Sequence, residues 1–196
     1  VASECRAVLP QGSVLSLIDV LVSRKLEHFI TSRYHVPSHV LLGGRKKTQC
    51  LDSAWAGQLV LEKGLDLHAQ GAVASFDIRR FYDSFSPFAV AQVLIADGCP
   101  ILLCLAALCC QMMPSVYLNL LHSCIPVGHR TIGGVTGSRV AGSLGLAIVA
   151  GIIHERADHW KQWGFKLENS CISLATWIDN IFAYGNSALS CIAILD

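Results

Sequence analysis

The sequence predicts an α+β fold in which an antiparallel sheet packs on helices. Two observations support this class. Hydrophobic residues make up 53% of the chain and charged residues only 15%, so much of it is expected to be buried. Segments with helical apolar spacing also alternate with short runs of small and β-branched residues, which are typical of strands. With 196 residues, the chain is long enough for one well-buried domain or for part of a larger one.

The first third of the chain predicts two helices with a short apolar segment between them. Apolar residues recur at helical spacing over Ser13–Ser32, which ends before a turn at Tyr34–Pro37. Val40–Arg45 is short and apolar and contains a glycine pair, whereas Leu51–Leu65 again has helical spacing. Asp66–Gln70 is predicted to connect this part to the rest of the chain.

The middle of the chain predicts a strand followed by two helices. Gly71–Ile78 combines small and β-branched residues with an aspartate near its end, which favours a strand. A turn is expected over Phe81–Ser86. Pro87 suits the first position of a helix over Phe88–Asp97, and Ile101–Met113 forms a second apolar helix.

The last part predicts a strand, a long helix and a hairpin. Ser115–Leu121 is the strand, and a loop through Pro126 and Gly128 is expected to follow it. Val140–Trp163 is a long apolar helix. Two short strands, Cys171–Trp177 and Ile181–Tyr184, flank a tip at residues 178–180, and this order makes a hairpin.

Two aspartates stand where strands end, Asp77 after one strand and Asp179 at the hairpin tip. Phosphoryl transfer from a nucleoside triphosphate uses two divalent cations, and magnesium takes oxygen ligands, so such a site needs two carboxylates close together. The two aspartates would meet if their strands pair. Aspartate is also a common cap or turn residue, so the residues alone leave both roles open.

The composition limits the classes of protein and compartment. The net charge of +1 neither favours nor excludes nucleic acid as a partner. The nine cysteines include no CxxC pair, and the N-terminus has no secretory signal pattern. We therefore expect buried free thiols in a reducing, intracellular compartment, with a disulfide framework or zinc site as the alternative.

The apolar content raises a membrane alternative. Ile101–Met113 is too short to span a bilayer, whereas Ile132–Ile153 is long enough but is interrupted by Arg139, hydroxyl residues and glycines. Two buried helices explain both runs, and no membrane partner is expected. A small helical membrane protein is the alternative.

Four segments resemble motifs of reverse transcriptases of the non-LTR retrotransposon type. Phe76–Phe85 (FDIRRFYDSF) resembles the first palm motif, in which a strand delivers a metal-binding aspartate. Trp177–Asn180 (WIDN) resembles the catalytic hairpin, and Gly133–Ala141 (GGVTGSRVA) the glycine-rich motif that opens a long helix. Leu42–Asp52 is similar to the fingers segment. The four follow the family order and cover roughly Val40–Ser187.

This resemblance implies a polymerase palm with partial fingers: residues 1–70 fingers-like and residues 71–196 palm-like, in one structural unit that is part of a larger domain. It implies template-directed DNA synthesis with two Mg²⁺ or Mn²⁺ ions as cofactors. The implied partners are an RNA or DNA template-primer and a deoxynucleoside triphosphate. The implied site comprises metal ligands and catalytic carboxylates at Asp77 and Asp179, further metal ligands at Ile78 (carbonyl) and Asn180, nucleotide contacts at Arg45, Tyr82, Gly134 and Gly137, and nucleic-acid contacts at Lys46, Lys47 and Arg139.

The sequence departs from the family pattern in ways that bear on activity. Asn180 replaces the second aspartate of the hairpin, Thr136 replaces a glutamine, and Trp177 replaces a tyrosine. The chain ends at Asp196, soon after the hairpin, so a thumb is expected to be absent. Two hypotheses follow: a degenerate polymerase, or an inactive nucleic-acid-binding remnant of the same fold. Gln111 and Arg130 receive no role.

Overall fold

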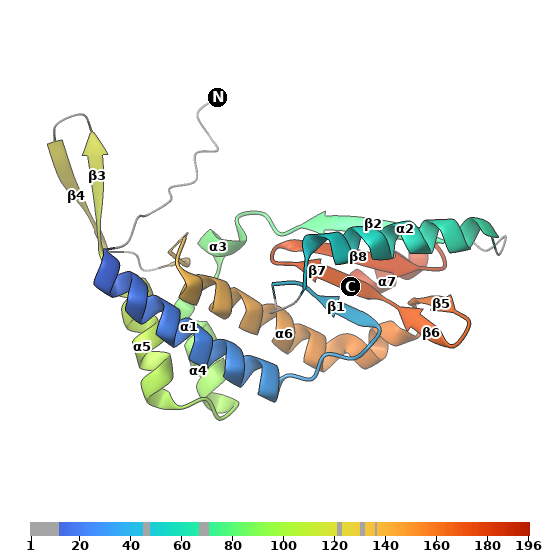
Figure 1. Cartoon of the computed structure of the whole chain (residues 1–196), viewed down its shortest axis with the longest axis horizontal. Coiled ribbons are helices and arrows are strands. Elements are labelled where there is room, and N and C mark those ends of the chain that lie inside the picture. Colours follow the sequence, from blue (N-terminus) through green and yellow to red (C-terminus); the bar gives the residue numbers. More distant parts are fainter. Residues whose placement is uncertain (1–11, 45–47, 67–70, 121–122, 130–131, 136) are drawn as a thin grey trace. The chain divides into compact units, whose positions relative to one another are not determined.

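The computed structural model describes residues 12–44, 48–66, 71–120, 123–129, 132–135 and 137–196. The chain forms two compact units that alternate along the sequence (Figure 1). The helical unit comprises Val1–Arg33 and Arg80–Ile148, and the sheet unit comprises Tyr34–Arg79 and Val149–Asp196. No boundary between the units falls at residue 70, where the fingers-like segment was predicted to end. The assignment of fingers and palm therefore stays a prediction.

The helical unit is built from helices that pack through buried apolar side chains. α1 packs against α5, and α5 packs against α4. Leu26, Leu94, Ala107 and Leu144 are all almost completely buried. The elements are α1 (Ser13–Arg33), α3 (Phe81–Ser84), α4 (Pro87–Ala96), α5 (Ile101–Met112), β3 (Ser115–Leu120), β4 (Ser123–His129) and the start of α6 (Arg139–Lys161), which continues into the sheet unit.

The start of α4 shows how local sequence sets a helix end. Pro87 stands in the first turn, as predicted, where its missing N–H costs no hydrogen bond. Ser86 caps the helix, because its hydroxyl accepts a hydrogen bond from the Ala89 N–H at 3.3 Å. The other predicted helices, over Ser13–Ser32, Leu51–Leu65, Ile101–Met113 and Val140–Trp163, are also confirmed to within two residues at each end.

Two segments of the helical unit differ from the prediction. Phe81–Ser84 was expected to be a turn but forms one helical turn, which starts after Arg80 in a left-handed conformation (φ 54°). The segment through Pro126 and Gly128 was expected to be a loop, but it is strand β4, paired antiparallel with β3. The register shifts between Val116 and Tyr117. A bulge in a two-stranded ribbon tolerates proline and glycine, which obscured the strand in the sequence.

The sheet unit holds a four-stranded sheet in the order β1-β7-β8-β2. β2 and β7 each pair antiparallel with β8, whereas β1 joins β7 in parallel. The α+β class is confirmed, with a mixed sheet instead of a wholly antiparallel one. The elements are β1 (Val40–Leu42), α2 (Cys50–Asp66), β2 (Ala72–Asp77), β5 (Phe165–Leu167), β6 (Ser170–Ile172), β7 (Leu174–Trp177), β8 (Asn180–Gly185) and α7 (Ala188–Leu195).

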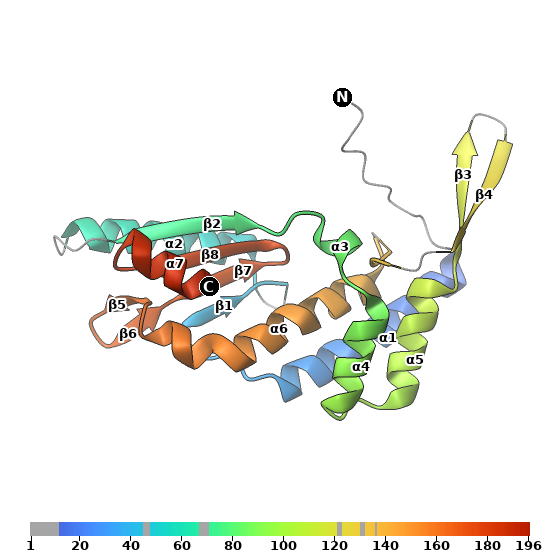
Figure 2. The ribbon, with the colours of Figure 1, turned by 180° about the vertical axis from the view of Figure 1, so that it is seen from behind.

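Helices cover both faces of this sheet. α2 lies over one face, where Ala56 and Val60 pack against Ala175 and Tyr184 (Figure 1). Burial raises the pKa of the Tyr184 phenol to about 12. α7 lies over the opposite face (Figure 2), and the Cys191 thiol lies 3.5 Å from the Ala72 carbonyl oxygen. With helices on both faces, chemistry at this sheet is expected at its ends.

The part of the chain from Phe165 onward contains elements that the sequence did not predict. β5 and β6 form a small antiparallel pair, so β6 and β7 replace the single strand expected over Cys171–Trp177. α7 follows Ser187, whose hydroxyl caps the helix by accepting from the Ser190 N–H at 3.1 Å. Its eight residues are too few for apolar spacing to reveal a helix.

One described helix, α6, is long and apolar enough to cross a membrane by length and composition. However, 56% of its most apolar window is buried within the chain. A core helix satisfies the same criterion, so the membrane alternative is not favoured.

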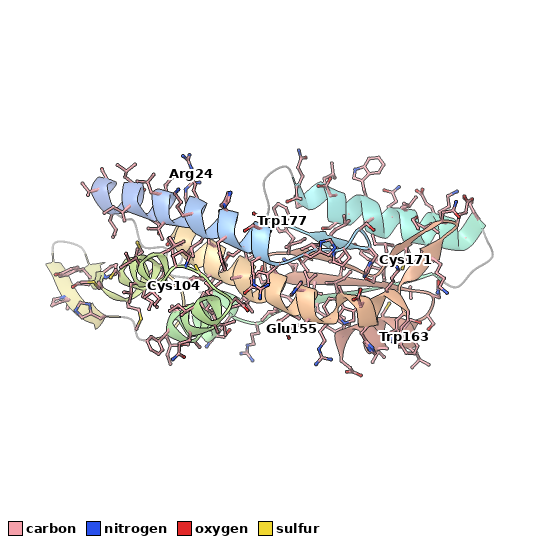
Figure 3. The ribbon with its side chains drawn as sticks, turned by 90° about the horizontal axis from the view of Figure 1, so that it is seen from below. Arg24, Cys104, Glu155, Trp163, Cys171 and Trp177 are labelled. Carbon is pink, nitrogen blue, oxygen red and sulfur yellow. The ribbon has the colours of Figure 1, made fainter. Side chains whose placement is uncertain are left out.

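The seven cysteines whose side chains the structure describes are free thiols, as expected, although Cys50 and Cys109 are exposed. Burial is the first cause that raises the pKa of Cys99, to about 12, and of Cys110, to about 11. Cys104 lies in α5 among the helices of the helical unit (Figure 3). Buried thiols with raised pKa values hold little thiolate at neutral pH and are therefore poor metal ligands and nucleophiles.

Candidate active site

The two predicted catalytic aspartates lie at the same end of the sheet. Asp77, the last residue of β2, is paired with Asn180, the first residue of β8. The Ile78 N–H donates a hydrogen bond to the carbonyl oxygen of Asp179 at 3.0 Å. Trp177 and Asn180 close the β7–β8 hairpin, so its tip consists of Ile178 and Asp179. The predicted metal-ligand set is therefore brought together by strand pairing.

The chemistry of these groups suits a hard divalent cation. Asp77 is exposed, and Asp179 and Asn180 are partly exposed. Among the residues that the structure describes, neither carboxylate takes part in a hydrogen bond or an ion pair. Directly opposed residues in an antiparallel pair have Cβ atoms about 5 Å apart, so Asp77 and the Asn180 amide share one face. Two carboxylates with carbonyl and amide oxygens form an all-oxygen donor set, as magnesium prefers.

The candidate metal site has only two carboxylates, fewer than a protein site that binds a metal ion without a substrate usually has. Within the described part of the chain, no group of three or more histidine, cysteine or acidic side chains is placed to hold a metal. Magnesium in polymerase-type sites is usually bound by one or two carboxylates together with substrate phosphates. Asp77 and Asp179 supply that number.

The hairpin tip has a backbone that its residue type does not favour. Ile178 has a φ of 57°, in the left-handed region that β-branched residues rarely adopt. Such a conformation costs about 1–3 kcal/mol and is more common at functional sites than elsewhere. The closing pair of Trp177 and Asn180 holds Ile178 there, and the bond from the Ile78 N–H holds the backbone of Asp179.

The glycine pair that precedes Arg45 lies beside this tip. The Gly43 N–H donates to the Thr176 carbonyl oxygen at 2.7 Å. An added Cβ at Gly43 would lie 2.6 Å from Cε3 of Trp177, so only glycine lets the chain pass the indole. β1 runs parallel to β7, and therefore its chain leaves the sheet at the same end as Asp179. The predicted contacts at Arg45, Lys46 and Lys47 lie outside the described residues.

In the helical unit, the predicted Tyr82 and Gly134 are joined by a hydrogen bond. The Gly134 N–H donates to the Tyr82 carbonyl oxygen at 2.6 Å, and the Gly133 N–H donates to that of Phe85 at 2.9 Å. The rings of Phe81, Tyr82 and Phe85 also pack against one another, with centroids 5.4 to 6.4 Å apart. These contacts fix the partly exposed Tyr82 ring next to the glycine-rich segment.

The two predicted glycines of that segment differ in what requires them. An added Cβ at Gly134 would lie 2.9 Å from the Cβ of Ala141 and 3.0 Å from the Phe85 ring, so packing within the unit already requires glycine there. Gly137 is exposed and has a φ of 98°, which leaves its backbone open to a ligand. Arg139, the first residue of α6, is also exposed. Thr136 lies outside the described residues.

Sequence reasoning missed two buried polar residues, Asp19 and Gln111, that bond to the glycine-rich segment. Asp19 accepts from the Arg139 N–H at 2.7 Å, and Gln111 accepts from the Val135 N–H at 2.7 Å. A signal was present in the sequence for each. Asp19 shares the inner face of α1 with apolar residues, and Gln111 is the only polar non-cysteine side chain in α5.

No protein-family model matches the chain, and no curated protein sequence matches it. Solved structures do match. Apo telomerase from Candida tropicalis, truncated from its C-terminal domain, aligns with 93% of this chain at 10% identity and a TM-score of 0.59. Telomerase from Candida albicans, in complex with a fragment of telomeric RNA, aligns with 92% at 12% identity and a TM-score of 0.52.

This chain spans 36% and 32% of those two chains. Telomerase is a reverse-transcriptase-related polymerase. At such low identity the likeness concerns the fold alone. The chain therefore has an α+β fold that matches, in part, the reverse-transcriptase-like fold of these telomerases.

Proposed function

We propose that the chain is a reverse-transcriptase nucleotidyltransferase domain of the non-LTR retrotransposon type, which extends a DNA strand on a nucleic-acid template. The observation that carries the proposal is the pairing of Asp77 with Asn180 beside Asp179. These residues come from the two segments that resemble the catalytic motifs, and strand pairing places them at one end of a sheet. The reverse-transcriptase-like fold supports the proposal independently.

Asp77 and Asp179 hold two Mg²⁺ or Mn²⁺ ions in this proposal, with the Ile78 carbonyl and the Asn180 amide as further oxygen ligands. When bound, such ions activate the attacking hydroxyl and neutralise the triphosphate. The chain's own contribution is a rigid platform, because Asp77 ends a paired strand and Asp179 lies in a two-residue tip. Both carboxylates are ready to bind because no protein group within the described residues occupies them.

The substrate contacts follow the resemblance. Tyr82 packs beneath the sugar and disfavours a 2′-hydroxyl, and Arg45 binds the triphosphate, since a guanidinium matches phosphate oxygens in a bidentate manner. Gly134 and Gly137 border the nucleotide. The nucleic-acid backbone is bound by Lys46, Lys47 and Arg139. The RNA fragment bound to the Candida albicans telomerase supports nucleic acid as the class of partner.

Primer extension tests the proposal. Wild-type protein is incubated with a template-primer, deoxynucleotides and Mg²⁺ or Mn²⁺, beside Asp77→Ala, Asp179→Ala and Asp158→Ala. Asp158 is an exposed aspartate on α6 and is the charge-matched control. We expect metal-dependent extension in wild type and Asp158→Ala, with a loss of at least about a hundredfold in the other two because a metal ligand is removed. Equal extension by all four proteins would refute the assignment.

A second candidate function is nucleic-acid binding without catalysis. Asn180 favours it, because an amide keeps an oxygen ligand but lacks the charge that strengthens metal binding. The same fold then holds RNA or DNA but does not extend it. Retained RNA binding with no extension in wild type, together with extension gained in Asn180→Asp, would indicate this function. The reducing intracellular compartment stays a prediction from the cysteines.

A further inference from the structure

The glycine-rich turn, here Gly133–Val135 with Gly137 and Ser138, is held by buried polar side chains from two helices. Asp19 of α1 is 2% exposed and accepts from the Ser138 hydroxyl at 2.5 Å and from the Arg139 N–H at 2.7 Å. Gln111 of α5 is 1% exposed. Its Oε1 accepts from the Val135 N–H at 2.7 Å, and its Nε2 donates to the Ser138 hydroxyl oxygen at 2.8 Å.

The direction of each hydrogen bond in this network is fixed by the donor inventory. The Ser138 hydroxyl donates to Asp19 Oδ1, so its single proton points to Asp19. The Ser138 oxygen then accepts from Gln111 Nε2 and, at 3.3 Å, from the Ala141 N–H. The remaining Gln111 oxygen must therefore face Val135. Each buried polar atom of the three side chains has a partner, and buried networks of this kind hold one arrangement only when complete.

Asparagine at position 19 could not replace the aspartate. With its amide nitrogen toward Arg139, two N–H donors would face each other. With the nitrogen toward Ser138, it would meet an oxygen whose accepting positions already take Gln111 and Ala141, and it would also face the Val140 N–H, 3.4 Å from Asp19 Oδ1 in the wild type. The network thus requires a carboxylate and not merely a polar side chain.

The position of Arg139 at the start of α6 indicates the role of the hydrogen bonds made by Asp19. A cation in the first turn of a helix is unfavourable, because the positive end of the helix dipole lies there. The Arg139 side chain is nevertheless exposed at that end of α6, while its N–H is fixed by Asp19. The Asp19 carboxylate offsets the helix charge, and Arg139 is left exposed two residues after the exposed Gly137.

We propose that Asp19, acting through Ser138 and with Gln111, is a positioning residue that holds Gly137 and Arg139 in the arrangement that binds the sugar–phosphate backbone of a nucleic acid. This inference rests on the proposed function for its ligand but not for its geometry. Asp19 itself need not touch the nucleic acid, because its bonds go to Ser138 and to the backbone of α6.

Amide hydrogen exchange tests the positioning role without any activity. The variants are Asp19→Asn and Gln111→Met, and Ser23→Ala is the matched control. The Ser23 hydroxyl lies 2.9 Å from that of Ser143, so its loss also removes a buried bond between α1 and α6. It leaves in place the bond from the Ser143 hydroxyl to the Arg139 carbonyl oxygen at 3.2 Å and every bond to the turn. We expect exchange of the Arg139 amide to accelerate about tenfold in Asp19→Asn, and that of the Val135 amide similarly in Gln111→Met, the scale of one buried hydrogen bond.

The control and the reference amide separate positioning from general loss of stability. The Gly134 amide, bound to Tyr82, should keep its exchange rate in every variant. Ser23→Ala should leave the Arg139 and Val135 amides unchanged. Unaltered exchange of Arg139 in Asp19→Asn would overturn the inference, and so would equal acceleration in Ser23→Ala.

RNA affinity then tests the functional part through a double-mutant cycle. Asp19→Asn and Arg139→Gln should each weaken binding of a single-stranded RNA about tenfold, and the double variant should fall clearly short of the product of the two losses, because Asp19 acts in part through Arg139. Full additivity, or normal affinity in Asp19→Asn, would overturn the inference. If wild type binds no RNA, the proposed function fails, while the exchange rates still decide whether Asp19 fixes the turn.

Discussion

Replacement of Gly145 by alanine tests how the short helix that carries Tyr82 is held against α6. An added Cβ at Gly145 would lie 2.8 Å from Cε1 and 3.3 Å from Cζ of Phe81. That ring is buried and packs against Tyr82 and Phe85, so it has little room to move. Gly142 is the matched control in the same helix, because an added Cβ there meets nothing within 4 Å.

Gly142→Ala should stabilise the protein, whereas Gly145→Ala should not. Alanine in a helix interior is favoured over glycine by about 1 kcal/mol, and Gly142→Ala should gain that amount. Overpacking a core costs about 1–3 kcal/mol, which cancels or exceeds the gain at Gly145. The free energies of unfolding of the two variants, from urea titrations, should therefore differ by about 1–3 kcal/mol. Equal stabilisation of both variants would refute the packing of Phe81 against α6.

Three further predictions concern the sheet unit and the buried thiols. Gly43→Ala should lower the free energy of unfolding by about 1–3 kcal/mol and shift the fluorescence emission of the adjacent Trp177. An unchanged emission spectrum and an unchanged urea midpoint would contradict the contact between Gly43 and Trp177. Tyr184→Phe should lower the free energy of unfolding by about 1 kcal/mol, because the phenol donates to the Ser53 carbonyl at 2.9 Å; equal midpoints would show that this bond contributes nothing. Burial raises the pKa of Cys99 from 9.0 to about 12, so the folded state binds the thiol proton more tightly than the unfolded state does. The protonated thiol therefore favours folding fully below pH 9, and this contribution is lost as the pH rises toward 12. Urea midpoints should fall over this range, and by less in Cys99→Ala; an equal fall would place the cause elsewhere.

The sequence was informative where a signal is local. Apolar spacing identified α1 and α6, and Pro87 located the start of α4. The run of small residues before Asp77 and the polar tip around Asp179 predicted a strand and a hairpin, and both formed. These features depend on neighbours a few residues apart, which is the range over which backbone preferences act.

The remaining features depend on contacts between distant segments. Asp19 and Ser138 are 119 residues apart, so nothing near either residue shows that they bond. β1 joins β7 in parallel, and the partner of Val40 is Leu174, more than 130 residues later in the chain. No local sequence pattern specifies this partner or its direction. The sequence therefore predicted the candidate metal ligands Asp77 and Asp179 but not Asp19 and Gln111, which position the glycine-rich turn.

Iron-mediated cleavage would test the metal site most directly. Fe²⁺ that occupies a magnesium site generates hydroxyl radicals in the presence of ascorbate and peroxide, and these cut the backbone next to the bound ion. A shared site predicts cuts at both Asp77–Ile78 and Ile178–Asn180, with both sets lost in Asp77→Ala and suppressed by excess Mg²⁺. Cuts at only one of the two segments, or cuts that persist in Asp77→Ala, would contradict a metal site shared by Asp77 and Asp179.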